Sequence, residues 1–124
     1  MWWMRGRSDV IAQLTARERE GLAISVATLA ELYEGVASAR DPAAAGSALN
    51  NFLQLVTIIR LSETVAARFG KEAALLRRSG QPLPDFDLVI AATALHHGLI
   101  LLTEDGHFAR IAGLQVQSLS SVTR

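Results

Sequence analysis

The order of apolar and polar positions predicts alternating strands and helices in the first half of the chain. Leu22–Ile24 is a short apolar run typical of a buried strand, and Ser25 can cap a helix that comes directly after it. In that helix an apolar stripe recurs at helical spacing, and Glu31 lies at its edge. A second helix is expected over about residues 43–55, and a strand over Thr57–Leu61. The stripe consists of Val26, Leu29, Ala30, Tyr33 and Val36.

A long amphipathic helix is expected next, with Ser62 as its cap. Its apolar positions recur at helical spacing and predict one buried face, and its charged positions predict a solvated face. The buried face comprises Val65, Phe69, Ala73 and Leu76, and the solvated face comprises Arg68, Lys71, Glu72 and Arg78.

The remaining segments predict a buried helix followed by two short strands. Asp85–Leu95 is apolar nearly all round, which indicates a buried helix. Leu99–Leu102 is typical of a strand that is covered on both faces. A short helix is expected over 106–111, and Leu114–Leu119 alternates like an edge strand.

Strands that alternate with helices predict an α/β domain with a mainly parallel central sheet between helical layers. The 124 residues fit one domain over residues 1–124, with no repeats and no interdomain linker. In such folds ligands gather at the carboxyl ends of the strands, which directs attention to the residues directly after Leu102.

Composition narrows the classes of function. Twelve basic residues balance twelve acidic ones, so nucleic-acid binding would need a local patch. The sequence has no cysteine, which excludes a disulfide scaffold and a zinc–thiolate site and fits a reducing cytoplasm. The longest nearly apolar stretch, Leu88–Leu95, is too short to cross a bilayer of about 30 Å, so no membrane association is expected.

Three carboxylates occupy unusual positions in the sequence. Asp105 comes after a buried strand, Asp87 begins an apolar helix, and Glu31 borders an apolar face. A buried carboxylate needs hydrogen bonds, a cation or a raised pKa. If the three converge, oxygen-only ligands favour Mg²⁺ or Mn²⁺ over zinc.

Each carboxylate also has a structural explanation. Asp87 can complement the helix dipole behind an Asp85 N-cap. Glu31 can be a solvated residue paired with an arginine, and Asp105 can be a turn residue before Gly106. Spacing alone does not choose between these alternatives and a shared metal site.

Three motifs in series resemble those of PIN-domain ribonuclease toxins of the VapC type. Val26-Ala-Thr-Leu-Ala-Glu-Leu-Tyr-Glu-Gly-Val36 looks like the second motif of that family, and Asp87-Leu-Val-Ile-Ala-Ala-Thr-Ala-Leu95 looks like its third. Leu101-Leu-Thr-Glu-Asp-Gly-His-Phe108, together with Ile111-Ala-Gly-Leu-Gln-Val116, is similar to the fourth. The match runs from about Leu22 to Val116, in the order and spacing of the family.

The resemblance implies a PIN-like three-layer α/β/α fold and a metal-dependent endoribonuclease. It places Glu31, Asp87 and Asp105 at positions of acidic metal ligands, and Thr103 at a position that supports the site. One or two Mg²⁺ or Mn²⁺ ions would hold the scissile phosphate and activate a water for in-line attack. Glu34, Asp85 and Glu104 do not align with ligand positions. A homodimer, an RNA substrate and a small VapB-like antitoxin that covers the acidic pocket are also implied.

The family opens with an apolar strand that ends in Asp-Thr and supplies a first acid, and no such segment precedes the matched region here. Met1–Arg7 resembles the start of the family's first helix, directly after that strand, and Asp9 is a poor substitute for the missing acid. The resemblance therefore implies an N-terminally truncated PIN domain with three of four acids. Two functions are alternatives: a ribonuclease toxin, or a catalytically impaired module that binds the antitoxin. A receiver-type signalling domain is disfavoured, because an early acidic pair is absent.

Other residues carry lesser expectations. His107 can touch substrate phosphate or pack half-buried before Phe108, and packing is favoured. His96 and His97 are expected near the C-terminal carbonyls of their helix. Trp2 and Trp3 fit core or interface positions. A phosphate-binding patch would draw on Arg5, Arg7, Arg17, Arg19, Arg77 and Arg78, for which solvated arginine is the default interpretation.

Overall fold

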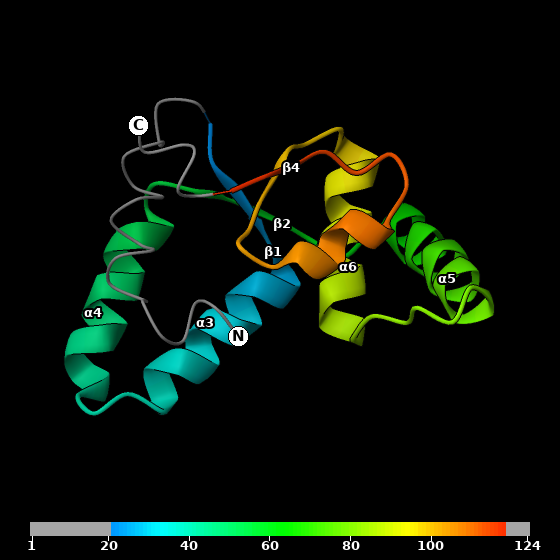
Figure 1. Ribbon diagram of the computed structural model, residues 1–124. Coiled ribbons are helices and arrows are strands. Elements are labelled where there is room, and N and C mark those ends of the chain that lie inside the picture. The colour runs from blue at the N-terminus through cyan, green and yellow to red at the C-terminus, as the bar shows by residue number, and fades with distance from the viewer. Residues whose placement is uncertain (1–20, 119–124) are drawn as a thin grey trace. The chain divides into compact units, whose positions relative to one another are not determined.

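The computed structural model describes residues 21–118, which fall into two compact units, each of which is described by itself. The first unit ends at Ile59 and the second begins at Arg60 (Figure 1). Predictions for Trp2, Trp3, Asp9 and the four arginines before residue 20 lie outside the described residues.

In the first unit, the described residues from 21 onward form two strands that pair in parallel and two helices. Its elements are β1 (Ala23–Ser25), α3 (Val26–Ala37), α4 (Pro42–Leu53) and β2 (Thr57–Ile59). Ala23 pairs with Thr57, and the register continues to Ser25 and Ile59. The helices α3 and α4 pack against each other and supply the connection that a parallel pair requires (Figure 1).

Ser25 ends β1 and caps α3, as its position in the sequence predicts. Its hydroxyl oxygen accepts a hydrogen bond from the backbone N–H of Thr28 at 3.1 Å and donates one to the Thr28 hydroxyl at 3.2 Å. The cap satisfies one of the backbone donors left open at the start of a helix. It thereby fixes the point at which α3, the helix that carries Glu31, leaves the sheet.

Ser25→Ala should lower the free energy of unfolding by about 1 kcal/mol, since the N-cap acceptor is lost. Urea denaturation of the full chain measures the change. Ser38→Ala is the matched control, because Ser38 closes the other end of α3 through its backbone N–H. An equal loss in both variants would show that the Ser25 hydroxyl does not carry the effect.

The predicted apolar stripe of α3 is confirmed in part, because Leu29 and Val36 pack against the core of this unit, and is wrong at its other positions. Val26, Ala30 and Tyr33 are exposed, the last at 50%. The buried residues of α3 are Ala27, Glu31, Leu32 and Gly35. Leu32 joins a core with Ile24 from β1 and with Leu49 and Phe52 from α4, and the position of α4 therefore decides which face of α3 is covered. Glu31 consequently lies on the buried face and not at its edge.

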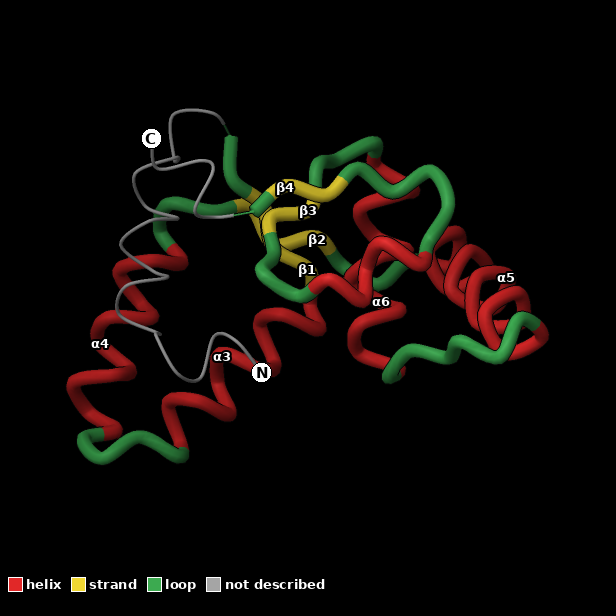
Figure 2. The backbone as a smooth tube through the Cα atoms, viewed as in Figure 1, coloured by secondary structure: helices red, strands yellow, loops and turns green. Residues whose placement is uncertain are grey.

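Up to residue 118, the second unit shows two helices that pack side by side, a second parallel pair of strands and a short 3₁₀ helix (Figures 1 and 2). Leu101 pairs with Val116, and Leu102 pairs with Gln117. The elements are α5 (Glu63–Arg78), α6 (Asp85–His97), β3 (Leu101–Leu102), η2 (Gly106–Arg110) and β4 (Val116–Gln117).

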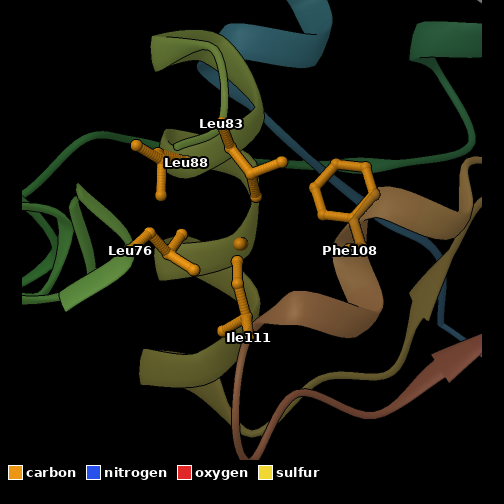
Figure 3. Packing of buried hydrophobic residues seen from close by; sticks show 6 residues of the cluster. Leu76, Leu83, Leu88, Phe108 and Ile111 are labelled. Carbon is orange, nitrogen blue, oxygen red and sulfur yellow. The ribbon is translucent and has the colours of Figure 1, made fainter. Parts of the chain in front are cut away.

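One apolar cluster holds the second unit together (Figure 3). Leu76 of α5 and Leu88 of α6 meet Phe108 and Ile111 from the segment after β3. Ala91 of α6 is fully buried in the same cluster, which allows the neighbouring side chains to approach the helix closely. The cluster anchors η2 to α6, and these two elements carry Asp105 and Asp87 at or near their N-termini.

Two expectations for the helices of this unit need correction. Glu72, assigned to the solvated face of α5, is buried, and the guanidinium of Arg68 one turn earlier lies 3.2 Å from its carboxylate. Pro84, and not Asp85, is the N-cap of α6; its extended backbone starts the helix without a side-chain cap. Asp85 is instead the first residue of α6, and both Asp85 and Asp87 lie in its first turn.

The strand expected over Leu99–Leu102 is shorter than predicted. Gly98 ends α6 in the left-handed conformation, and the N–H of Leu99 bonds back to the carbonyl of Ala94 at 2.9 Å. That capping motif uses the N–H of Leu99, so β3 begins only at Leu101. Leu99 and Ile100 are exposed and are not covered on both faces.

The α/β class and the parallel strands are confirmed, since both strand pairs are parallel and each is linked through helical segments. Within residues 21–118, no helix is both long enough and apolar enough to cross a bilayer.

Candidate functional site

The segment directly after β3 is built around Thr103. Thr103 is 4% exposed, and its backbone N–H donates to the carbonyl of Gln117 at 3.0 Å, so the segment stays attached to the end of β4. The Thr103 hydroxyl accepts a hydrogen bond from the N–H of Asp105 at 3.1 Å. A buried threonine therefore fixes the backbone two residues further on, where the predicted ligand lies. This geometry fits the supporting position that the resemblance assigns to Thr103.

Asp105 is the N-cap of η2, and its Oδ1 accepts from the backbone N–H of His107 at 2.9 Å. The imidazole Nδ1 of His107 lies 3.0 Å from the same oxygen. The packing expected for His107 is wrong, because its side chain is 64% exposed. The ring turns back to the carboxylate, and Phe108 enters the core instead.

Asp87 lies in the first turn of α6 and is half-buried. Burial raises the pKa of its carboxyl above the ordinary value, the negative charge of Asp105 raises this pKa further, and His107 opposes the rise. The effect of Asp105 on Asp87 shows that the second unit brings these two predicted ligands near each other. Two carboxylates that repel each other in a partly buried setting favour a bound cation.

Asp87→Asn should raise the free energy of unfolding at neutral pH, in the absence of metal, by less than about 1 kcal/mol, because solvent screens the half-buried carboxyl. The raised pKa means that the fold favours the protonated carboxyl, so the ionised form of Asp87 lowers stability. The difference between variant and wild type should be full above the raised pKa and disappear below the ordinary value of 3.8. Urea denaturation across this pH range measures it, with Asp85→Asn as the exposed control from the same turn.

Glu31 belongs to the first unit, in the middle of α3, and is 6% exposed. Gly35 is also buried and lies one helical turn later on the same face. Among residues 21–118, no group of three or more histidines, aspartates and glutamates is arranged to hold a metal ion. Asp87 and Asp105 are thus the predicted ligands that the structure brings together, and a site shared with Glu31 stays a prediction.

Three acids that neighbour the predicted ligands in sequence but do not align with ligand positions are exposed. Glu34 lies on the exposed side of α3, and Asp85 is exposed at the start of α6. Glu104 is also exposed, and both of its carboxylate oxygens accept from the hydroxyl of Ser118, at 2.9 and 3.1 Å. These three acids serve as natural controls for the three predicted ligands.

The contact between Asp105 and His107 is the feature of this site that sequence reasoning missed. The signal was available in Asp105-Gly-His107, because an aspartate often bonds to the backbone two residues on. As expected, His96 and His97 lie in the last turn of α6, near its C-terminal carbonyls. In addition, Nε2 of His96 lies 3.4 Å from the hydroxyl of Thr64 in α5, and its ring meets that of His97 edge to face. Arg77 and Arg78 are exposed in the last turn of α5.

Comparison with known proteins shows the class of the chain. A family model described as the PIN domain matches residues 1–114. The tRNA(fMet)-specific endonuclease VapC of Shigella flexneri is 30% identical over 100 residues, which cover 80% of this chain and 76% of that protein. The chain therefore belongs to the PIN-domain family and, within it, to the VapC ribonucleases.

Solved structures agree with this assignment. VapBC2 from Rickettsia felis, bound to a DNA fragment from its promoter, matches with a TM-score of 0.81 and 27% identity, over 94% of this chain and 90% of that one. VapBC-5 from Mycobacterium tuberculosis, a member of the VapBC family of toxin–antitoxin systems, matches with a TM-score of 0.64 and 30% identity, over 76% and 77% of the two chains. The PIN fold predicted from the three motifs is confirmed.

Proposed function

We propose that this chain is a Mg²⁺- or Mn²⁺-dependent RNA endonuclease and the toxin of a toxin–antitoxin pair. The observation that carries the proposal is that Asp105, three residues after the strand β3, lies near enough to Asp87 for its charge to add to the burial that raises the pKa of Asp87. Membership of the VapC ribonucleases supports the reaction class. The Shigella flexneri relative, named for its action on a tRNA, supports RNA as the substrate.

The residues present fit a hard divalent cation. Asp87 and Asp105 supply oxygen ligands, which suit Mg²⁺ and Mn²⁺, and a cation would offset the repulsion between them. Glu31, a carboxylate on the buried face of α3, is the third ligand of the proposal. Thr103 supports Asp105 through the backbone and is not itself a ligand in this proposal.

The residues around this site orient its ligands. The Thr103 hydroxyl accepts from the backbone N–H of Asp105, and the backbone N–H of His107 donates to the Asp105 carboxylate, so the turn that carries this ligand is held on both sides. A bound divalent cation supplies positive charge to the scissile phosphate and lowers the pKa of a water molecule. Arg77 and Arg78, exposed on α5, are candidates for contacts with phosphates further along the RNA.

The partners of the proposal are inferred from relatives. The solved neighbours are VapBC assemblies, which supports a VapB-like antitoxin as the partner that covers the acidic site. We also propose that the chain forms a homodimer. Because RNA is the proposed substrate, the proposed site of the reaction is the cytoplasm.

The test is cleavage of single-stranded and structured RNAs by the purified full chain with Mg²⁺ or Mn²⁺. Cleavage is expected with either ion and should stop when a chelator is added. RNA that stays intact with every ion, together with stable binding of a VapB-like antitoxin, would instead support the alternative of a catalytically impaired antitoxin-binding module.

A further inference from the structure

One residue supplies both hydrogen-bond contacts to a single oxygen of Asp105. The backbone N–H of His107 donates to Oδ1 at 2.9 Å, and Nδ1 of its ring lies 3.0 Å from that oxygen. Neither contact involves Oδ2. A carboxylate oxygen that faces two donors loses rotational freedom, because a turn of the carboxylate would break both contacts at once.

The contact defines which ring nitrogen of His107 carries hydrogen. An ionised carboxylate only accepts hydrogen bonds, so Nδ1 must be a donor toward Oδ1. In the neutral ring, Nε2 then has no hydrogen and points away from the carboxylate. The hydrogen bond therefore requires the Nδ1–H form of His107 and does not require a charged ring.

A structural role alone explains little of this arrangement. The His107 side chain is 64% exposed, and an exposed pair of this kind adds little to stability. The turn is already held by the N–H of Asp105 on Thr103 and by the N–H of His107 on Asp105. What the ring adds is control over the direction of the Asp105 carboxylate, on the side of η2 that lies near Asp87.

We propose that His107 is a positioning residue, whose Nδ1–H holds Oδ1 of Asp105 and leaves Oδ2 to bind a divalent cation. This inference rests on the proposed function, because it concerns a ligand of the proposed metal site. Hydrogen bonds to a metal-binding carboxylate commonly change metal affinity by tenfold or more. The proposal assigns this effect on metal affinity to His107, a residue that contacts neither the cation nor the RNA in the proposed site.

The experiment measures Mn²⁺ affinity of the full chain by calorimetry, without RNA. His107→Ala removes the ring donor, His107→Gln places an amide where Nε2 lies, and His107→Asn places an amide N–H close to the position of Nδ1. The Ala and Gln variants should bind Mn²⁺ about tenfold more weakly, and the Asn variant should stay within about twofold of wild type. His97→Ala is the matched control, since His97 is also exposed and its ring meets the ring of His96 rather than a carboxylate.

The outcomes separate this inference from the proposed function. If wild type binds Mn²⁺ and His107→Ala binds it equally well, the positioning role is overturned and the metal site stands. Equal weakening in the Asn and Ala variants also overturns it, because the Nδ1 donor would then not be the cause. A wild-type chain that binds no Mn²⁺ overturns the proposed function and this inference together. Ring ¹⁵N shifts of His107, measured for the neutral imidazole, should show hydrogen on Nδ1; hydrogen on Nε2 contradicts the proposal.

Discussion

Removing any one of three carboxylates should slow metal-dependent RNA cleavage by at least about 100-fold at a fixed ion concentration. Each substitution deletes a negatively charged oxygen ligand and keeps nearly the same shape, so the loss reports on charge and coordination and not on packing. Mn²⁺ affinity should fall in parallel, because the same oxygens bind the cation. The substitutions are Glu31→Gln, Asp87→Asn and Asp105→Asn.

Neighbouring acids provide a control for each substitution. Glu34→Gln, Asp85→Asn and Glu104→Gln remove the same charge from the same three segments, and all three side chains are exposed. Each control should keep its cleavage rate within about threefold of wild type. If Glu34→Gln is as slow as Glu31→Gln, net charge and not a defined ligand explains the effect, and the assignment of Glu31 is wrong.

Double substitution sharpens the same prediction. If Asp87 and Asp105 act through one cation, Asp87→Asn/Asp105→Asn should be little slower than either single variant, because the first loss already removes the cation's contribution. Two independent effects would multiply, giving a double variant about 10⁴-fold slower than wild type. Single-turnover cleavage of a defined RNA distinguishes the two patterns.

Local features of the structure could be predicted from the sequence because local chemistry decides them. Ser25 and Ser62 cap α3 and α5 as expected, since a serine before a helical stretch can satisfy a backbone donor by itself. The apolar run of Asp85–Leu95 identified a buried helix, and α6 covers it. The parallel arrangement was predictable from the alternation of strands and helices.

Features that depend on tertiary neighbours were predicted less well. In α3 both Val26-Tyr33 and Ala27-Leu32 are apolar pairs, and tertiary packing, in which Leu32 joins a core with residues of β1 and α4, decides which face is covered. Glu31 lies next to Leu32 on that buried face, so its burial was underestimated. Asp87 and Asp105 are 18 positions apart and lie on different elements. Their spacing in the sequence therefore could not predict that they approach each other, and only the family resemblance did.

Phe108→Ala should lower the free energy of unfolding by about 3–5 kcal/mol, the usual range for a buried phenylalanine. Phe108 is 4% exposed and fills the cluster between η2 and α6, with Leu83, Leu88 and Ile111 around it (Figure 3). The truncation leaves a cavity and removes the anchor that fixes η2 immediately after the acidic turn. Since domains of this size are stable by about 5–15 kcal/mol, the variant should remain partly folded at low temperature.

The same substitution should also weaken Mn²⁺ binding, because Phe108 adjoins His107 and anchors the turn that carries Asp105. Phe86→Ala is the matched control: Phe86 lies beside Asp87 on α6 but is 48% exposed, so its truncation should change stability by less than about 1 kcal/mol. Phe108→Leu should recover most of the lost stability, since it refills much of the cavity. Urea denaturation ranks the three variants, and equal losses in Phe108→Ala and Phe86→Ala would show that the cluster does not hold η2 in place.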